Sequence, residues 1–247
     1  MNEEEIKKIV LKTLQEYNKS KAFTDRKTTD TPTDAFSIAN KRYVDGLSTF
    51  PVYLVANEKI YYTTYFESFD GWQQFGGTRA PGLGGASLQT TATLGTECRI
   101  NTEVTIGDIN WDVNSGFQSL LKSTSTTNQT IYFGLGDLTV GDGTQEGYGF
   151  KISNGTLYAL STQSDGATAV ETTKDISTGV TLTSVNVYKA LKSGNTISYY
   201  INGDLKTVIT TGLPDGASPV VLLFSVKNSA AENKSLLLGH ASVFYEF

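Results

Sequence analysis

The stretch GYGFKISNGTLYALST, residues 147–162, predicts the local fold of this chain most directly. Apolar and polar residues alternate on both sides of Asn154-Gly155, as they do in β-strands with one buried face. Both central residues of a type I′ turn take positive φ, and Asn-Gly adopts this geometry readily. We therefore predict a β-hairpin here. The same argument predicts a second hairpin around Asn202-Gly203, in YINGDL, residues 200–205.

The same alternation recurs from about residue 56 to the end of the sequence. Twelve short runs show it, and Gly, Asn, Asp and Ser separate them. So many short strands at regular spacing are typical of a β-sandwich or a β-barrel. The runs are KIYYTTYFESF, ASLQTTATL, CRINTEVTI, GFQSLLKST, TIYFGLGD, GYGFKI, TLYALST, SVNVYKAL, TISYYI, LKTVITT, VVLLFSVK and ASVFYEF.

Composition excludes several classes of protein. Thirteen Tyr and twelve Phe in 247 residues argue against disorder. The net charge is −5, and the mildly acidic part after residue 50 has no basic stripe, so we expect no nucleic-acid partner. Cys98 is the single cysteine, which excludes a disulfide within the chain. No apolar run approaches 18 residues and no signal sequence is recognisable, so we expect neither a membrane span nor secretion by a signal peptide.

Residues 1–21, MNEEEIKKIVLKTLQEYNKSK, predict a short amphipathic helix. Asn2 and Glu5 have the spacing of a capping box. A helix of about 18 residues is marginal alone in water, so its apolar stripe needs a partner. That partner is either the β-rich part of the chain or parallel copies of the same helix, and we expect the second arrangement, in a homotrimer. The stripe consists of Ile6, Ile9, Val10, Leu14 and Tyr17.

A polar, turn-prone linker follows the predicted helix and leads to PTDAFSIANKRYVDG, residues 32–46. We call this second stretch the docking segment, because its apolar side chains are too few to form a core and are expected to be buried against another surface. Its apolar side chains include Phe36, Ile38, Tyr43 and Val44. The chain is thus expected to comprise an anchoring and oligomerisation segment (1–50), a connector strand (51–66) and a β-rich domain (67–247).

Residues 66–247 resemble the concanavalin A-like, or laminin-G-like, jelly-roll family. The similarity is carried by GYGFKISNGTLYALST, YKALKSGNTISYYINGDLKTVITTGLP and LLLGHASVFYEF, and ESFDGWQQF resembles the first strand of such domains. The resemblance implies a mainly β chain with a jelly-roll β-sandwich after the N-terminal helix and linker. These motifs are structural, so they indicate a fold better than an activity.

The docking segment carries a second resemblance. DTPTDAFSIANKRYVD, residues 30–45, is similar to a segment recurrent in bacteriophage tail and head fibre proteins. This implies a virion protein that is anchored to other virion proteins by its N-terminus and displays a lectin-like domain to host-surface or environmental glycans. Two alternatives stay open: a structural decoration protein of capsid or tail that binds no sugar, and a polysaccharide depolymerase.

Catalysis is not expected. Catalytic triads and Cys-His pairs would have to use His240, the single histidine, which lies in a predicted strand. The glucanases of the resembled fold supply their carboxylates from Glu-x-Asp-x-x-Glu on one strand, and this spacing does not occur here. Glu97 and Glu103 flank a strand, with Arg99 closer to Glu97, and are expected to be solvated edge charges.

Two loops carry hard oxygen ligands of the kind that suits calcium, although neither matches a complete calcium-binding loop. Turn formation and loop solubility are the alternative roles for these side chains, and we favour those roles. No other cofactor is expected. The candidates are Asp108, Asp112 and Asn114 in DINWDVNSG, and Asp137, Asp142 and Glu146 in DLTVGDGTQEG.

Sugar rings stack on aromatic faces, so exposed aromatic residues are the candidates for glycan contact. Aromatic residues on the strands of a sandwich more often belong to the core, and this alternative applies to each candidate. Trp111 is favoured because it lies in a loop-like stretch. The candidates are Trp111, Trp72, Tyr132 and Tyr148, and Tyr199 and Tyr200 are also available.

Overall fold

The structure is a computed structural model and describes residues 59–64, 66, 69, 71–82, 85–102, 111–136, 146–164, 169–215 and 220–245. The chain divides into two units, Met1–Pro51 and Val52–Phe247, and all described residues belong to the second unit. The predicted N-terminal helix and the docking segment lie outside the described residues, as do Glu103, Asp108, Asp137 and Asp142.

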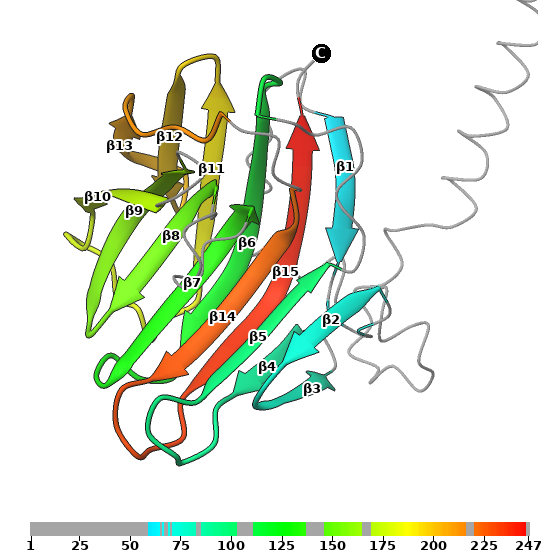
Figure 1. The fold of residues 1–247 in the computed structure, drawn as a ribbon, viewed down its shortest axis with the longest axis vertical. Helices are drawn as coiled ribbons and strands as arrows, with labels where there is room; N and C mark the ends of the chain where they lie inside the picture. The colour runs from blue at the N-terminus through cyan, green and yellow to red at the C-terminus, as the bar shows by residue number, and fades with distance from the viewer. Residues whose placement is uncertain are drawn as a thin grey trace, which may run out of the picture. The chain divides into compact units, whose positions relative to one another are not determined.

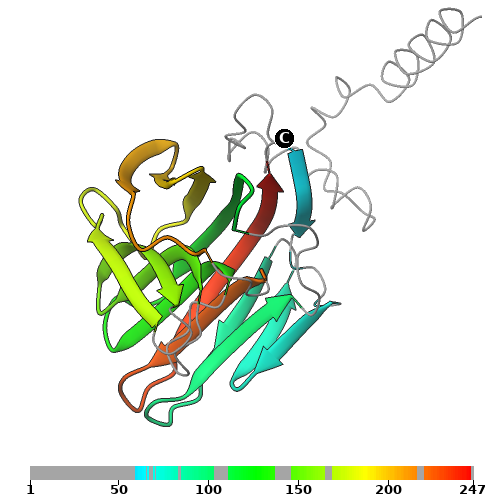
Figure 2. The same ribbon diagram turned by 45° about the horizontal axis from the view of Figure 1, so that its top comes forward.

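The described residues form two antiparallel sheets, with no helix among them and therefore none that could span a membrane. The first sheet has the order β13-β12-β11-β6-β15-β4-β3, and β1 pairs with the second half of β15. In Figure 2 the red strand β15 accordingly lies between green β6 and cyan β1. Its strands are β1 (Lys59–Thr64), β3 (Thr78–Gly82), β4 (Gly85–Gln89), β6 (Ser115–Ser123), β11 (Asn186–Ser193), β12 (Thr196–Ile201), β13 (Asp204–Ile209) and β15 (Ser235–Tyr245).

The second sheet has seven strands in the order β10-β9-β8-β7-β14-β5-β2, which follow one another from left to right in Figure 1. Neighbours in this order are far apart in the sequence at β7-β14-β5, as the crossovers of a jelly roll require. The strands are β2 (Trp72–Phe75), β5 (Glu97–Thr102), β7 (Gln129–Gly136), β8 (Gly147–Ser153), β9 (Thr156–Ser164), β10 (Ala169–Asp175) and β14 (Leu222–Asn228).

Both predicted hairpins are confirmed. Asn154 and Gly155 take φ of 45° and 88° between β8 and β9. Asn202 and Gly203 take φ of 52° and 91° between β12 and β13. The side-chain oxygen of Asn202 also accepts a hydrogen bond of 2.8 Å from the backbone N–H of Val187, which fixes this turn to β11.

Strands β2, β3 and β10 are absent from the twelve predicted runs, although ESFDGWQQF, which contains β2, was expected to form the first strand of the domain. All three are edge strands, where burial is low and the apolar-polar alternation is weak. Pro81 lies in β3, and proline is tolerated at a sheet edge because no second neighbour needs its missing N–H. The predicted connector 51–66 contains β1 and the fully buried Phe66, so the sandwich starts before residue 67.

Aromatic side chains from both sheets meet in the core between them. Phe133 and Phe150 of the second sheet stack with ring centroids 5.2 Å apart. Tyr188 and Tyr199 of the first sheet meet Phe150 edge-on, at centroid distances of 5.3 and 5.4 Å. Offset stacking and edge contacts are the favourable arrangements for aromatic rings, so this cluster joins the two layers. The predicted β-sandwich is therefore confirmed.

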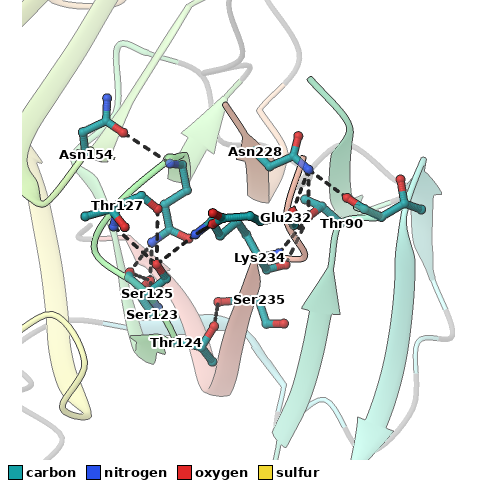
Figure 3. A network of polar contacts seen from close by, with 12 residues as sticks. Thr90, Ser123, Thr124, Ser125, Thr127, Asn154, Asn228, Glu232, Lys234 and Ser235 are labelled. Carbon is teal, nitrogen blue, oxygen red and sulfur yellow. Dashed lines mark hydrogen bonds and ion pairs between the residues drawn. The ribbon is translucent and has the colours of Figure 1, made fainter. Parts of the chain in front are cut away.

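A buried polar network closes one end of the sandwich (Figure 3). The Lys234 ammonium is almost fully buried, and it donates hydrogen bonds to Glu232 Oε2 at 2.6 Å and Ser125 Oγ at 3.2 Å. Asn228 Nδ2 donates to the carbonyls of Thr91 and Glu232, at 2.7 and 2.9 Å. Buried polar groups with such partners fix the turns that carry them, here the turns β4–β5, β6–β7 and β14–β15.

Gly76 and Gly77 carry the chain from β2 in one sheet to β3 in the other. Gly77 has a φ of +52°, and a β-carbon there would lie 2.3 Å from Cys98 Cβ and 2.5 Å from the carbonyl oxygen of Gln89. Gly194 has the same φ of +52° in the β11–β12 turn, but a β-carbon there would meet nothing within 4 Å.

We expect Gly77→Ala to destabilise the sandwich by about 1–3 kcal/mol more than Gly194→Ala. Both variants place a side chain at positive φ, but only the first forces atoms together against backbone and a buried side chain. Urea unfolding of the full chain measures the difference in the free energy of unfolding. Equal losses in the two variants would show that the crossing at Gly77 has room for a side chain.

Candidate functional site

Three of the four predicted glycan-binding aromatic residues are buried in the core. Trp72 packs against Phe66 and Phe224, with ring centroids 5.3 and 6.1 Å apart. Trp111 and Tyr148 meet edge-on at 6.0 Å. Trp111 is 2% exposed, and Trp72 and Tyr148 are similarly covered. A sugar needs an open ring face, so the expectation that these three residues bind glycans is corrected: they build the interior.

Tyr132 is the candidate that lies elsewhere. It alternates along β7 with Ile131 and Phe133, which point into the core, so its ring lies on the outer face of the seven-stranded sheet. There it joins Leu160 and Leu223 in a small apolar cluster separate from the core. Tyr132 is 9% exposed, so its ring is largely covered on this face.

Strand pairing places Tyr132 in a row of side chains that crosses all seven strands on this outer face. Residues directly opposite each other in an antiparallel ladder share a face, and each step across strands is about 4.8 Å, so six steps span roughly 29 Å. We call this set the outer row. From β2 to β10 it consists of Phe75, Arg99, Ser225, Tyr132, Lys151, Tyr158 and Asp175.

An ion pair lies at the centre of the outer row. Lys151 Nζ donates a hydrogen bond of 2.6 Å to Glu171 Oε2, and the same ammonium lies 5.3 Å from the centroid of the Tyr132 ring. Burial alone lowers the pKa of Lys151, but the hydrogen bond to Glu171 and the contact with Tyr132 together raise it above its ordinary value. The Lys151 side chain is therefore a fixed cation, with 20% of its surface exposed.

The other carboxylate of this face comes from β5. Ser225 Oγ donates a hydrogen bond of 2.6 Å to Glu97 Oε1. Burial raises the pKa of the Tyr132 phenol, and the charges of Glu171 and Glu97 raise it further while Lys151 opposes them. Both carboxylates thus act on the same tyrosine, which remains a neutral hydroxyl donor and acceptor at neutral pH.

The β2 end of the row presents an aromatic ring to solvent. Phe75 is 44% exposed, and the Arg99 guanidinium lies 4.4 Å from its ring centroid. A cation over one side of a ring leaves the other side for a further apolar contact. Together with Tyr158 on β9, this gives aromatic groups at separate positions along the row.

Glu171 has one paired and one unpaired carboxylate oxygen. Its Oε2 pairs with Lys151, whereas its Oε1 is shielded from solvent and has no hydrogen-bond partner. The Glu171 side chain as a whole is 27% exposed, so the ion pair lies partly open to solvent on this face. Carboxylate acceptors beside aromatic rings are the groups that a polyhydroxylated ligand needs.

The predicted calcium ligands Asp112 and Asn114 lie in the turn before β6. Asn114 Oδ1 accepts a hydrogen bond of 2.9 Å from the backbone N–H of Gly194. The buried Lys192 ammonium donates to the carbonyls of Trp111 and Gly194. Burial lowers the pKa of Lys192 and the charge of Asp112 opposes this. A lysine ammonium thus occupies the polar centre of this turn, which favours the turn-forming role of Asp112 and Asn114.

The remaining described metal candidate, Glu146, is buried directly before β8. Within the described ranges, no group of three or more His, Cys, Asp or Glu side chains is arranged to hold a metal ion. His240 lies on the eight-stranded sheet, where its Nε2 is 2.9 Å from Ser242 Oγ. His240 and the carboxylates of the outer row thus belong to different sheets.

No protein-family model matches this chain, and no curated protein matches it. Solved structures do match. The carbohydrate recognition domain of Emp47p superposes with a TM-score of 0.60 at 12% identity, over 78% of this chain and 99% of that domain. The catalytic domain of an endo-1,3-beta-glucanase (laminarinase) from Thermotoga petrophila RKU-1 superposes with a TM-score of 0.58 at 12% identity, over 78% and 99%. The fold is a concanavalin A-like jelly roll.

A third match is the carbohydrate esterase vb_24B_21 from Shiga toxin-encoding bacteriophage phi24B. Its TM-score is 0.52 at 13% identity, over 77% of this chain and 100% of that one. At such identities the matches establish the jelly-roll fold alone. The matched jelly rolls include a laminarinase catalytic domain and a carbohydrate recognition domain.

Sequence reasoning missed most of the outer row. The predicted hairpin at Asn154-Gly155 could have placed Lys151 opposite Tyr158, because a two-residue loop fixes the register. Glu97 was expected to be a solvated edge charge, whereas it lies opposite Lys227 of β14 and accepts a hydrogen bond from Ser225 Oγ. Nothing local in the sequence brings β14 between β7 and β5.

Proposed function

We propose that this chain is a non-enzymatic virion fibre protein whose jelly roll binds glycans through the outer row. The observation that carries the binding proposal is the partly exposed Lys151–Glu171 ion pair on the same sheet face as the exposed Phe75 ring. Phe75 is exposed and Tyr158 is half-buried, and both provide further ring contacts along the row. Sugars combine apolar ring faces with many hydroxyl donors, and this row offers partners for both.

The virion part of the proposal rests on the resemblance of residues 30–45 to phage fibre segments and on the predicted helix before them. In this account the helix forms a trimer and Phe36 and Tyr43 bind another virion protein. Particles assembled with a Phe36→Ala, Tyr43→Ala double variant should then lack the protein, while the melting of the jelly roll is unchanged. Normal incorporation of the variant would remove the docking segment from the anchor.

The glycan-binding proposal predicts that ring contacts in the outer row are needed for affinity. The full chain is applied to a glycan array, and a retained glycan is titrated by calorimetry. Phe75→Ala and Tyr158→Ala should each weaken binding about ten-fold, since each removes one ring contact of about 1–2 kcal/mol. The matched control is Leu205→Ala on the other sheet, a side chain that is 55% exposed, and it should bind as the wild type does.

Unchanged affinity in both ring variants would refute the outer row as the site. An array that retains no glycan would favour the alternative of a structural decoration protein without sugar binding.

A polysaccharide depolymerase is the second candidate function. The specific observation for it is that Glu97 and Glu171 lie on the same face and both act on Tyr132, since glycosidases use paired carboxylates. Incubation of a retained glycan with the full chain should release no reducing ends if the chain only binds. Release that Glu97→Gln or Glu171→Gln abolishes would establish the enzyme instead.

A further inference from the structure

We infer that the outer row selects uncharged glycans over acidic ones, and that the Lys151–Glu171 ion pair is the selecting element. This inference rests on the proposed function of the row. It concerns which sugars are accepted, and it is carried by the pairing of the charged groups on this face.

Lys151 is the cation closest to the centre of the row, and it is already paired. Its ammonium lies 2.6 Å from Glu171 Oε2 and over the Tyr132 ring, with only 20% of the side chain exposed. A sugar carboxylate that bound here would have to take the ammonium from Glu171. Glu171 would then keep a partly buried negative charge without a partner, beside a second negative charge, which costs more than the new pair returns.

Among the described residues, the rest of this face offers no surplus positive charge. Three cations lie in or beside the outer row, and three carboxylates match them. Lys227 stands directly opposite Glu97 across β14 and β5, and Arg99 covers the Phe75 ring. The cations are Arg99, Lys151 and Lys227, and the carboxylates are Glu97, Glu171 and Asp175. An acidic chain lying along the row would meet these carboxylates without a surplus counter-charge.

A neutral sugar does not have to break the Lys151–Glu171 ion pair. Its hydroxyl groups carry no charge, so it can lie along the row while the ion pair of Glu171 with Lys151 stays intact. A neutral ligand therefore separates no charges. Selection comes from the ion pair that an acidic sugar would have to break.

The test uses matched ligands, namely uronate hexasaccharides and their carboxyl-reduced counterparts, on one array with a general glycan panel. The wild-type full chain should retain glycans that lack carboxylates and bind the reduced forms at least about ten-fold more tightly than the uronates. Glu171→Gln frees the Lys151 ammonium and should reverse or abolish this preference. Its folding is checked by the thermal melting midpoint, because Glu171 lies on the edge strand β10.

Asp204→Asn is the matched control, because it removes a carboxylate beside Lys206 on the edge strand of the other sheet. It should leave the preference unchanged. Tight retention of uronates by the wild type, with loss of binding in Glu171→Gln, would overturn the selection while the proposed function stands. A preference for neutral glycans that survives in Glu171→Gln would also overturn it. Retention of no ligand in any arm would instead refute the proposed function.

Discussion

Replacing Phe150 with alanine is expected to destabilise the sandwich by about 3–5 kcal/mol. Phe150 is fully buried and touches four aromatic rings from both sheets, so its removal opens a cavity at the contact between the layers. Edge and stacked ring contacts add to the area lost from burial. Urea unfolding of the full chain, followed by far-UV circular dichroism, measures the change. The four rings are those of Phe117, Phe133, Tyr188 and Tyr199.

The matched control is Phe75→Ala, which removes the same side chain from an exposed edge-strand position. It should cost less than about 1 kcal/mol, as surface substitutions usually do. A loss below about 1 kcal/mol in Phe150→Ala would mean that the two sheets do not pack through this cluster.

Acidification from pH 6.5 to pH 4 is expected to remove about 3 kcal/mol of stability through His240. Burial lowers the pKa of His240 from 6.5 to about 4, so the unfolded chain binds a proton in this window and the folded chain does not. Stability is then fully present above pH 6.5 and is lost as the pH falls towards 4, by about 1.4 kcal/mol for each pH unit between the two pKa values. Lys122 and Lys189 lie on neighbouring strands, on the same sheet face as His240. Neither carries a negative charge, so neither favours the protonated form of the imidazole.

His240→Gln separates this effect from the titration of other groups. The side chain can still meet Ser242 Oγ, but it cannot take up a proton in this range. Wild type and variant are unfolded with urea at several values between pH 4 and pH 7. The advantage of the wild type should shrink steadily below pH 6.5. A constant difference across the range would show that His240 keeps an ordinary pKa in the folded chain.

The fold could be predicted where the signal is local. The two Asn-Gly turns fix their hairpins because backbone geometry at positive φ limits which residues fit, and both were correct. Alternation predicted most strands of the two sheets because half of each strand is buried. Strand β10 was missed since its edge position leaves most of its side chains in water, so AVETTKD carries little pattern.

The site could not be predicted to the same degree. Aromatic residues on strands do not reveal which face they occupy relative to the core until register and neighbours are known. Trp111 and Tyr148 turned inward, whereas Tyr132 lies one residue away from two core positions and faces outward. The carboxylate that matters most in the proposed site, Glu171, lies on the strand with the weakest pattern.

Hydrogen exchange with a bound glycan tests the central claim, that the outer face of the seven-stranded sheet is the binding surface. The full chain is exchanged with and without a glycan that the array retains, and peptides from both sheets are compared. Slower exchange is expected in peptides covering β8, β9 and β10, residues 147–175, because the ligand covers Lys151, Tyr158 and Glu171. Peptides covering β11 and β12, residues 186–201, should not change. Protection confined to those strands of the eight-stranded sheet would contradict the account.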